Sequence, residues 1–294
     1  MSRFLDPKIL MAIKDLSLAA KTTVDGFMIG INKSTLKGPG LEFSQYRSYQ
    51  PGDDLRWLDW KMYARSDRYY VRESEIETSI SVRLLVDASN SMNHREGEYS
   101  KIDYARYLAA SLAYLASKQG DATGLFVFQD GELYSLDSKN DHQHLARLLF
   151  RLESIQPAGK FTEAIQYKEI FSGAQRRELL IFVTDMYQEN EEIFKLLNSL
   201  VSLKHEIIVF HIMGKNEMSF DYKGYTNLED LESGKTVRID ASQSASYQEK
   251  LREYISIIKT YLHDRNIAYR LLTMDQPLDE ALRDFLNQRN KLSK

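Results

Sequence analysis

The sequence contains no cysteine, and this absence removes three kinds of chemistry at once. No disulfide can form, no thiolate can bind a metal, and no cysteine can act as a nucleophile. The disulfide framework of small secreted domains is therefore excluded. A reducing compartment is favoured.

Long apolar runs and a large net charge are also missing. Lys14, Asp15, Lys21 and Asp25 interrupt the first 30 residues, so we expect neither a signal peptide nor a membrane-spanning helix there. The formal net charge is only -3, which gives no whole-chain field to attract nucleic acid or an anionic membrane. We therefore expect a cytoplasmic protein without a nucleic-acid partner, with peripheral association with the inner membrane left open.

The 294 residues, 43% of them hydrophobic, suffice for one large domain or two modest ones. From residue 79 onward, short apolar runs alternate with segments of helical periodicity. The predicted strands are 82–87, 123–128, 179–184, 207–212 and 267–273, and the predicted helices are 102–116, 190–202, 246–263 and 278–286. This alternation predicts an α/β fold, a doubly wound, mostly parallel sheet flanked by helices and therefore Rossmann-like.

The first 78 residues differ in pattern and are predicted to form an N-terminal helical and extended segment. Apolar spacing indicates a helix over 7–21, residues 33–56 are loop-like, and a short helix is expected through Trp57 and Trp60. Residues 79–294 form the predicted sheet domain. Within it, residues 225–240 are expected to be an inserted hairpin that turns at Ser233-Gly234.

Oxygen-bearing side chains follow the predicted strands. Asp87, Ser89 and Ser91 form a D-x-S-x-S run at one strand end, Asp185 follows another strand, and Thr162 lies in a loop before a helix. Since ligands of such sheets bind beyond the carboxyl ends of the strands, these oxygens could surround one cation. Mg²⁺ is the expected metal, with Mn²⁺ and Ca²⁺ as alternatives that accept the same ligands. The alternative is a purely structural role as a helix N-cap, because Asp and Ser often accept hydrogen bonds from a first helical turn.

These five residues resemble the metal-ion-dependent adhesion site of von Willebrand factor type A (vWA) domains. That resemblance implies that Ser89, Ser91 and Thr162 contact the metal through hydroxyls, while Asp87 and Asp185 support it directly or through water. It also implies that an acidic residue of a protein partner completes the coordination. One departure is Phe161, where relatives often have glycine before the threonine.

Motifs outside the site are similar to the signature of the bacterial domain of unknown function 58 family. The resemblance spans nearly the whole chain and rests on the runs 38–43, 47–56, 58–61, 70–73 and 228–234. Members of that family are typically encoded beside MoxR-type AAA+ ATPases and membrane proteins with vWA domains. This resemblance implies both as partners in assembly or maturation of other proteins.

Two functions remain open from the residues. The first is a metal-dependent protein-binding module with no catalytic residues. The second is a metal-assisted hydrolase or phosphotransferase in which Asp87 is the nucleophile. The haloacid-dehalogenase pattern places a second carboxylate two residues after the first, and here that residue is Ser89. Binding is therefore the preferred interpretation.

Overall fold

The computed structural model describes ten stretches of the chain, which fall into two compact units. The described residues are 10, 12–13, 15–33, 45–51, 58, 60–73, 79–161, 177–220, 227–238 and 244–292. The larger unit comprises residues 1–28 and 79–294, and the smaller one comprises residues 29–78. The division therefore differs from the expected 1–78 and 79–294, because the chain up to residue 28 belongs with the sheet.

The larger unit is built on a six-stranded sheet with the order β12-β9-β8-β3-β6-β7. Five strands are parallel and β7 runs antiparallel to β6, which confirms the predicted fold class. The strands are β3 (Ser81–Asp87), β6 (Ala122–Gln129), β7 (Glu132–Lys139), β8 (Leu179–Thr184), β9 (Glu206–Met213) and β12 (Ala268–Thr273). The chain leaves β3 toward β6 and later returns on the other side of β3 through β8. The carboxyl end of β3 is therefore the switch point of the sheet.

The edge strand β7 was not expected from the sequence. Its exposure alternates along its length because one face is solvated, whereas β8 is buried throughout and β3 is buried from Val82 onward. It follows β6 through Asp130 and Gly131, whose φ angles of 48° and 77° suit a tight hairpin turn. This Asp-Gly pair is a hairpin signal that the sequence does carry.

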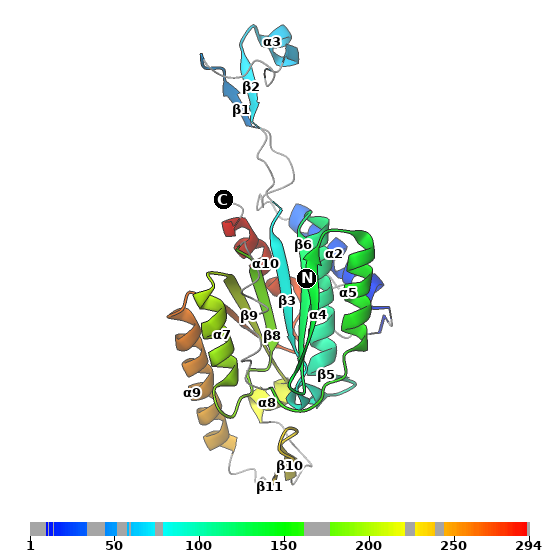
Figure 1. The fold of residues 1–294 in the computed structure, drawn as a ribbon, viewed down its shortest axis with the longest axis vertical. Coiled ribbons are helices and arrows are strands. Elements are labelled where there is room, and N and C mark those ends of the chain that lie inside the picture. The colour runs from blue at the N-terminus through cyan, green and yellow to red at the C-terminus, as the bar shows by residue number, and fades with distance from the viewer. Residues whose placement is uncertain are drawn as a thin grey trace. The chain divides into compact units, whose positions relative to one another are not determined.

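Helices cover both faces of the sheet (Figure 1). On one face, α4 (Lys101–Lys118) lies against β3 and β6, with α5 (His142–Ser154) and α10 (Asp279–Leu292) beside it. On the other face, α7 (Glu192–Ser202) and α9 (Ser244–His263) share a buried cluster with the strands. The predicted helices of this unit are confirmed, with ends that differ by a few residues.

The N-terminal region differs from the prediction in two places. Helix α2 (Leu16–Lys33) begins after Asp15, whose carboxylate accepts a 2.9 Å hydrogen bond from Leu18 N, so it overlaps the predicted 7–21 from Leu16 and continues beyond it. Residues 7–9, 11 and 14 of the predicted helix lie outside the described residues. Strand β1 (Gln45–Ser48) lies inside the stretch predicted to be loop-like and pairs antiparallel with β2 (Tyr70–Glu73). Its pairing partner is distant in sequence, so local composition did not reveal it.

Several short elements complete the two units. In the larger unit, strands β4 (Arg95–Glu96) and β5 (Tyr99–Ser100) pair antiparallel just before α4. Helix α3 (Trp60–Ser66) confirms a short helix at Trp60, whereas Trp57 lies outside the described residues. Strands β10 (Asn227–Glu229) and β11 (Thr236–Arg238) pair antiparallel, as predicted, and Gly234 turns with a φ of +67°. Helix α8 (Lys215–Ser219) follows β9.

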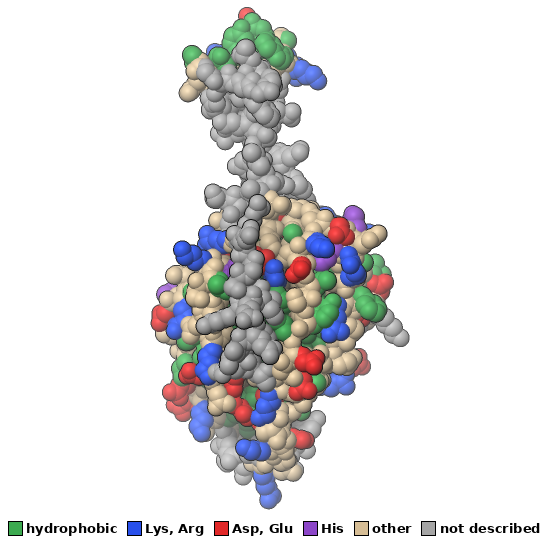
Figure 2. Space-filling model, viewed as in Figure 1, with side chains coloured by type: hydrophobic (Ala, Val, Ile, Leu, Met, Phe, Trp, Pro, Cys, Tyr) green, Lys and Arg blue, Asp and Glu red, His purple; other side chains and the backbone are tan. Residues whose placement is uncertain are grey.

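The described surface matches the balanced composition. On the face shown in Figure 2, acidic and basic side chains are interspersed over the described part of the larger unit. Across the described residues, no helix combines the length and apolar character that crossing a membrane requires.

Candidate oxygen-rich site at the sheet switch point

Asp87 lies at the end of β3 and is completely buried. Its Oδ1 accepts a 2.9 Å hydrogen bond from Ser89 N, and its Oδ2 accepts a 2.7 Å hydrogen bond from the Thr184 hydroxyl. Thr184 is the last residue of β8, the neighbour of β3. The two central strands therefore hold the carboxylate at the switch point.

The side chains of the two serines contact each other, and Ser91 also contacts Asp185, which follows the end of β8. Ser89 Oγ and Ser91 Oγ are 3.0 Å apart, and Ser91 Oγ donates to Asp185 Oδ1 at 3.2 Å. Ser89 precedes the 3-10 helix η3 (Asn90–Asn93), yet its side chain makes no capping hydrogen bond. The helix-cap alternative is therefore wrong for Ser89. The structure brings Asp87, Ser89, Ser91 and Asp185 together, as the sequence predicted.

Thr162 lies outside the described residues, but the segment before it is tied to the D-x-S-x-S loop. Ala158 N donates to Ala88 O at 2.9 Å, and Asn90 N donates to Gly159 O at 2.9 Å. Gly159 has a φ of +63°, and a Cβ there would stand 2.0 Å from Asp130 Oδ1, so glycine is required. The loop that leads to Thr162 therefore runs beside the site.

Phe161 has a structural reason to replace glycine. Its side chain is buried, and its ring centroid lies 5.3 Å from that of Phe128 and 6.0 Å from that of Phe182. The residue anchors the loop in the hydrophobic core.

A buried ammonium group joins the site, which the sequence did not predict. Lys101 Nζ donates to Asp185 Oδ2 at 3.0 Å and to Glu217 Oε1 at 2.9 Å. Its side chain is only 5% exposed. Lys101 is the first residue of α4, and nothing in the local sequence pattern around it indicates contact with Asp185, a strand end 84 residues away. Only the packing of α4 against the sheet brings them together.

The pKa values of the two aspartates shift in opposite directions. Burial and the negative charge of Asp185 raise the pKa of Asp87 to about 7, despite its hydrogen bonds with Ser89 and Thr184. Burial also acts to raise the pKa of Asp185, but the charge and hydrogen bond of Lys101 outweigh it and hold that pKa below its ordinary value. Asp185 is therefore the compensated carboxylate, while no cationic side chain pairs with Asp87 in the part of the chain that the structure describes.

A further carboxylate reaches the site from the hairpin. Burial, followed by the charges of Asp185 and Asp87, raises the pKa of Glu232 to about 7, whereas hydrogen bonding to Ser91 and Ser89 acts to lower it. No hydrogen bond of good geometry reaches its buried Oε1 within the described part of the chain. Sequence reasoning placed Glu232 in a family motif without a chemical role, so its proximity to the serines is information from the fold.

The donors suit a hard divalent cation. Among the described residues of the site, carboxylates outnumber the ammonium group of Lys101, and the donors on Asp87, Ser89, Ser91 and Asp185 are all oxygen. Among the residues that the structure describes, no three His, Cys, Asp or Glu side chains are grouped as a metal site by themselves. A cation here would depend on the serine hydroxyls for part of its coordination.

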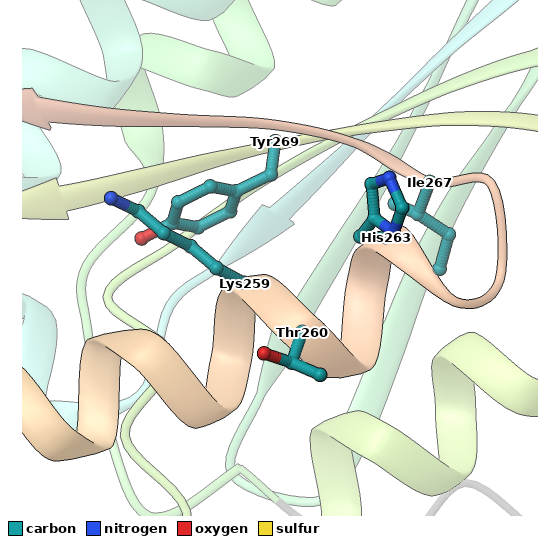
Figure 3. A pocket seen from close by; sticks show the side chains of 5 residues that line it. All are labelled: Lys259, Thr260, His263, Ile267 and Tyr269. Atoms are coloured by element: carbon teal, nitrogen blue, oxygen red, sulfur yellow. The ribbon is translucent and has the colours of Figure 1, made fainter.

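A separate pocket of ≈ 430 Å³ lies between α9 and β12 (Figure 3). It is lined by Lys259, Thr260, His263, Ile267 and Tyr269. The Tyr269 hydroxyl is 2.9 Å from His211 Nδ1, beneath the sheet edge. None of the predicted site residues lines this pocket.

Comparison with known proteins connects the chain to one family. The family described as "Protein of unknown function DUF58" matches residues 45–255. Uncharacterised proteins of Mycobacterium bovis and Mycobacterium tuberculosis are 26% identical over 232 residues, which covers 78% of this chain and 73% of theirs.

The solved structures found by comparison have low sequence identity to the chain. An aerotolerance-related membrane protein from Bacteroides fragilis is 16% identical, with a TM-score of 0.49 over 72% of this chain and 100% of that chain. The conserved hypothetical protein BatB from Bacteroides thetaiotaomicron is 17% identical, with a TM-score of 0.48 over the same shares.

Proposed function

Since the chain belongs to the family described as protein of unknown function DUF58, we propose its function from the chemistry of the site. It is a metal-dependent protein-interaction module. Asp87, Ser89, Ser91, Thr162 and Asp185 hold a divalent cation, with Mg²⁺ as the first choice and Mn²⁺ or Ca²⁺ as alternatives. The observation that carries the proposal is the contact of Ser89 Oγ with Ser91 Oγ, and of Ser91 Oγ with Asp185 Oδ1, beside the buried Asp87.

Charge balance supports a cation at this position. Asp87 is fully buried beside Asp185, and Lys101, whose ammonium group is the one found at the site among the described residues, is already bonded to Asp185 and Glu217. Burying an uncompensated carboxylate is unfavourable unless it is protonated or paired. A bound divalent cation would remove this penalty. Because neutral hydroxyls would supply part of its coordination, it would keep much of its charge and attract an acidic side chain of a partner.

The enzyme alternative receives less support from the geometry. A nucleophilic carboxylate has to approach its substrate, but Asp87 is fully buried and both of its oxygens accept hydrogen bonds from Ser89 N and Thr184. The position of the second carboxylate in the dehalogenase pattern is Ser89, whose hydroxyl pairs with Ser91. Binding is therefore the function that the site supports best.

Mn²⁺ binding tests the metal site directly. We expect titration of wild-type protein, followed by the electron paramagnetic resonance signal of free Mn²⁺, to give one tight site and a rise in melting temperature. Ser89→Ala combined with Ser91→Ala should abolish both effects. Ser154→Ala is the matched control, since that exposed serine on α5 bonds only to Arg151 O. Unchanged Mn²⁺ binding in the double variant would refute the assignment.

The proposed partner is a MoxR-type AAA+ ATPase, together with membrane proteins that carry vWA domains, in assembly or maturation of other proteins. This step rests on the family resemblance in the sequence. In a pull-down, the immobilised protein should retain the MoxR-type ATPase in Mg²⁺ and release it in EDTA. Retention by Asp185→Ala protein equal to that of the wild type would contradict metal-mediated binding.

A further inference from the structure

The hairpin β10–β11 is fixed to the site through Asp230. The Asp230 carboxylate accepts hydrogen bonds from Glu232 N at 3.0 Å, from the Tyr187 hydroxyl at 3.0 Å and from the Ser233 hydroxyl. Tyr187 N in turn donates to Asp185 Oδ1 at 3.1 Å. One side chain therefore shapes the turn and connects it to the loop that carries Asp185.

This turn directs Glu232 toward the two serines. Its Oε1 is buried without a hydrogen bond of good geometry in the described residues, and its carboxylate lies beside Ser91, Ser89 and the two aspartates. A buried oxygen of this kind is costly when it has no partner. A cation among these carboxylates would give the Glu232 oxygen a partner.

We propose that Glu232 is an internal ligand of the cation, so that the hairpin Asn227–Arg238 occupies the coordination position that an acidic side chain of a partner requires. This inference rests on the metal site of the proposed function. The partner must then displace Glu232, and binding is a competition between two carboxylates for one metal.

The hairpin is suited to being displaced. Its strands have three residues each and pair only with each other, separate from the six-stranded sheet. A two-stranded hairpin is marginally stable by itself in water. Among the described residues, the Tyr187–Asp230 hydrogen bond links its turn to the loop that carries Asp185, and water can replace this bond. Exchange of the internal carboxylate for an external one therefore leaves the core intact.

Water proton relaxation in the Mn²⁺-loaded protein tests this assignment. Removal of a protein ligand opens a coordination position to water, which raises the relaxation rate per bound Mn²⁺. We expect this increase in Glu232→Ala and Glu232→Gln, together with Mn²⁺ binding weakened by about tenfold through loss of a charged ligand. Glu229→Gln is the matched control, because Glu229 is an exposed glutamate of the same hairpin and should behave as the wild type.

The outcomes separate this inference from the proposed function. If wild-type protein binds no Mn²⁺, the metal site itself is refuted. If the wild type binds Mn²⁺ and both Glu232 variants match it in affinity and relaxation rate, the metal site stands and the internal ligand is refuted. Hydrogen exchange gives a second readout: Mn²⁺ should slow exchange of the 227–238 amides in the wild type and leave it unchanged in Glu232→Ala.

Discussion

Replacement of Asp87 by asparagine should stabilise the protein without metal and abolish its stabilisation by metal. Asparagine has nearly the same shape, and its Oδ1 can still accept the hydrogen bond from Ser89 N. The interaction with the Thr184 hydroxyl changes, because one carboxylate oxygen becomes an amide NH₂. The substitution therefore removes a buried charge while it preserves most of the local packing.

The magnitude follows from the pKa of Asp87, which is about 7 in the folded protein against an ordinary value of 3.8. Because the folded state holds this proton more tightly, the free energy of unfolding falls as pH rises from about 4 to about 7. At about 1.4 kcal/mol per pKa unit, ionised Asp87 destabilises the folded state by roughly 4 kcal/mol above that range. The altered Thr184 hydrogen bond offsets about 1–2 kcal/mol of the gain. We therefore expect Asp87→Asn to be more stable than the wild type by about 2–3 kcal/mol at pH 8 in EDTA.

Urea denaturation at pH 5 and pH 8, in EDTA and in saturating Mn²⁺, measures all four combinations. In EDTA the variant should lose less stability between the two pH values than the wild type does. In Mn²⁺ at one hundred times its dissociation constant, the wild type should gain about 2.7 kcal/mol and the variant nothing. The difference in free energy of unfolding between the two proteins should therefore shrink or change sign when Mn²⁺ is added.

A variant that is less stable than the wild type at pH 8 in EDTA would refute the reasoning, since the buried charge would then not be a penalty. An equal pH dependence in the two proteins would do the same. Asp264→Asn is the control, because Asp264 is exposed near the end of α9 and should change neither stability nor metal response.

The other predictions concern the supports of the site. Phe161→Ala should lower the free energy of unfolding in urea by about 3–4 kcal/mol, because it empties part of the aromatic cluster, and a loss below about 1 kcal/mol would contradict a core role. Gly159→Ala should lower the free energy of unfolding by about 1–3 kcal/mol and weaken Mn²⁺ binding, because its Cβ would overlap Asp130. If calorimetric titration gives the folded variant the Mn²⁺ affinity of the wild type, the loop has no role in the site. Asp121→Ala should cost about 3–5 kcal/mol in urea, because it removes the carboxylate that pairs with the buried Arg289 guanidinium. The Mn²⁺ affinity of this variant should be unchanged, because Asp121 lies at the amino-terminal end of β6 and Asp87 at the opposite end of the sheet. A weakened affinity would show that the ion pair and the metal site are coupled.

The carboxyl ends of the strands could be predicted because their signals are local. Buried parallel strands give short apolar runs, so the positions of Asp87 and Asp185 after two such runs were readable from the chain, and adjacent strands bring those ends together. The turn at Ser233-Gly234 was equally local. The Asp130-Gly131 turn was local too, but the strand after it was not inferred, although its alternating exposure is typical of an edge strand.

The chemistry around those strand ends required tertiary structure. The sequence determined the alternation of strands and helices, and with it four of the oxygen-bearing residues that meet at the switch point. Tertiary structure decided that Lys101 neutralises Asp185 and that Glu232 faces the serines, because both contacts join residues distant in sequence and on different elements. Periodicity reports which face of an element is buried, but the identity of the side chain opposite a given carboxylate depends on how helices and hairpins pack on the sheet. The charge balance of the site was therefore set by the fold.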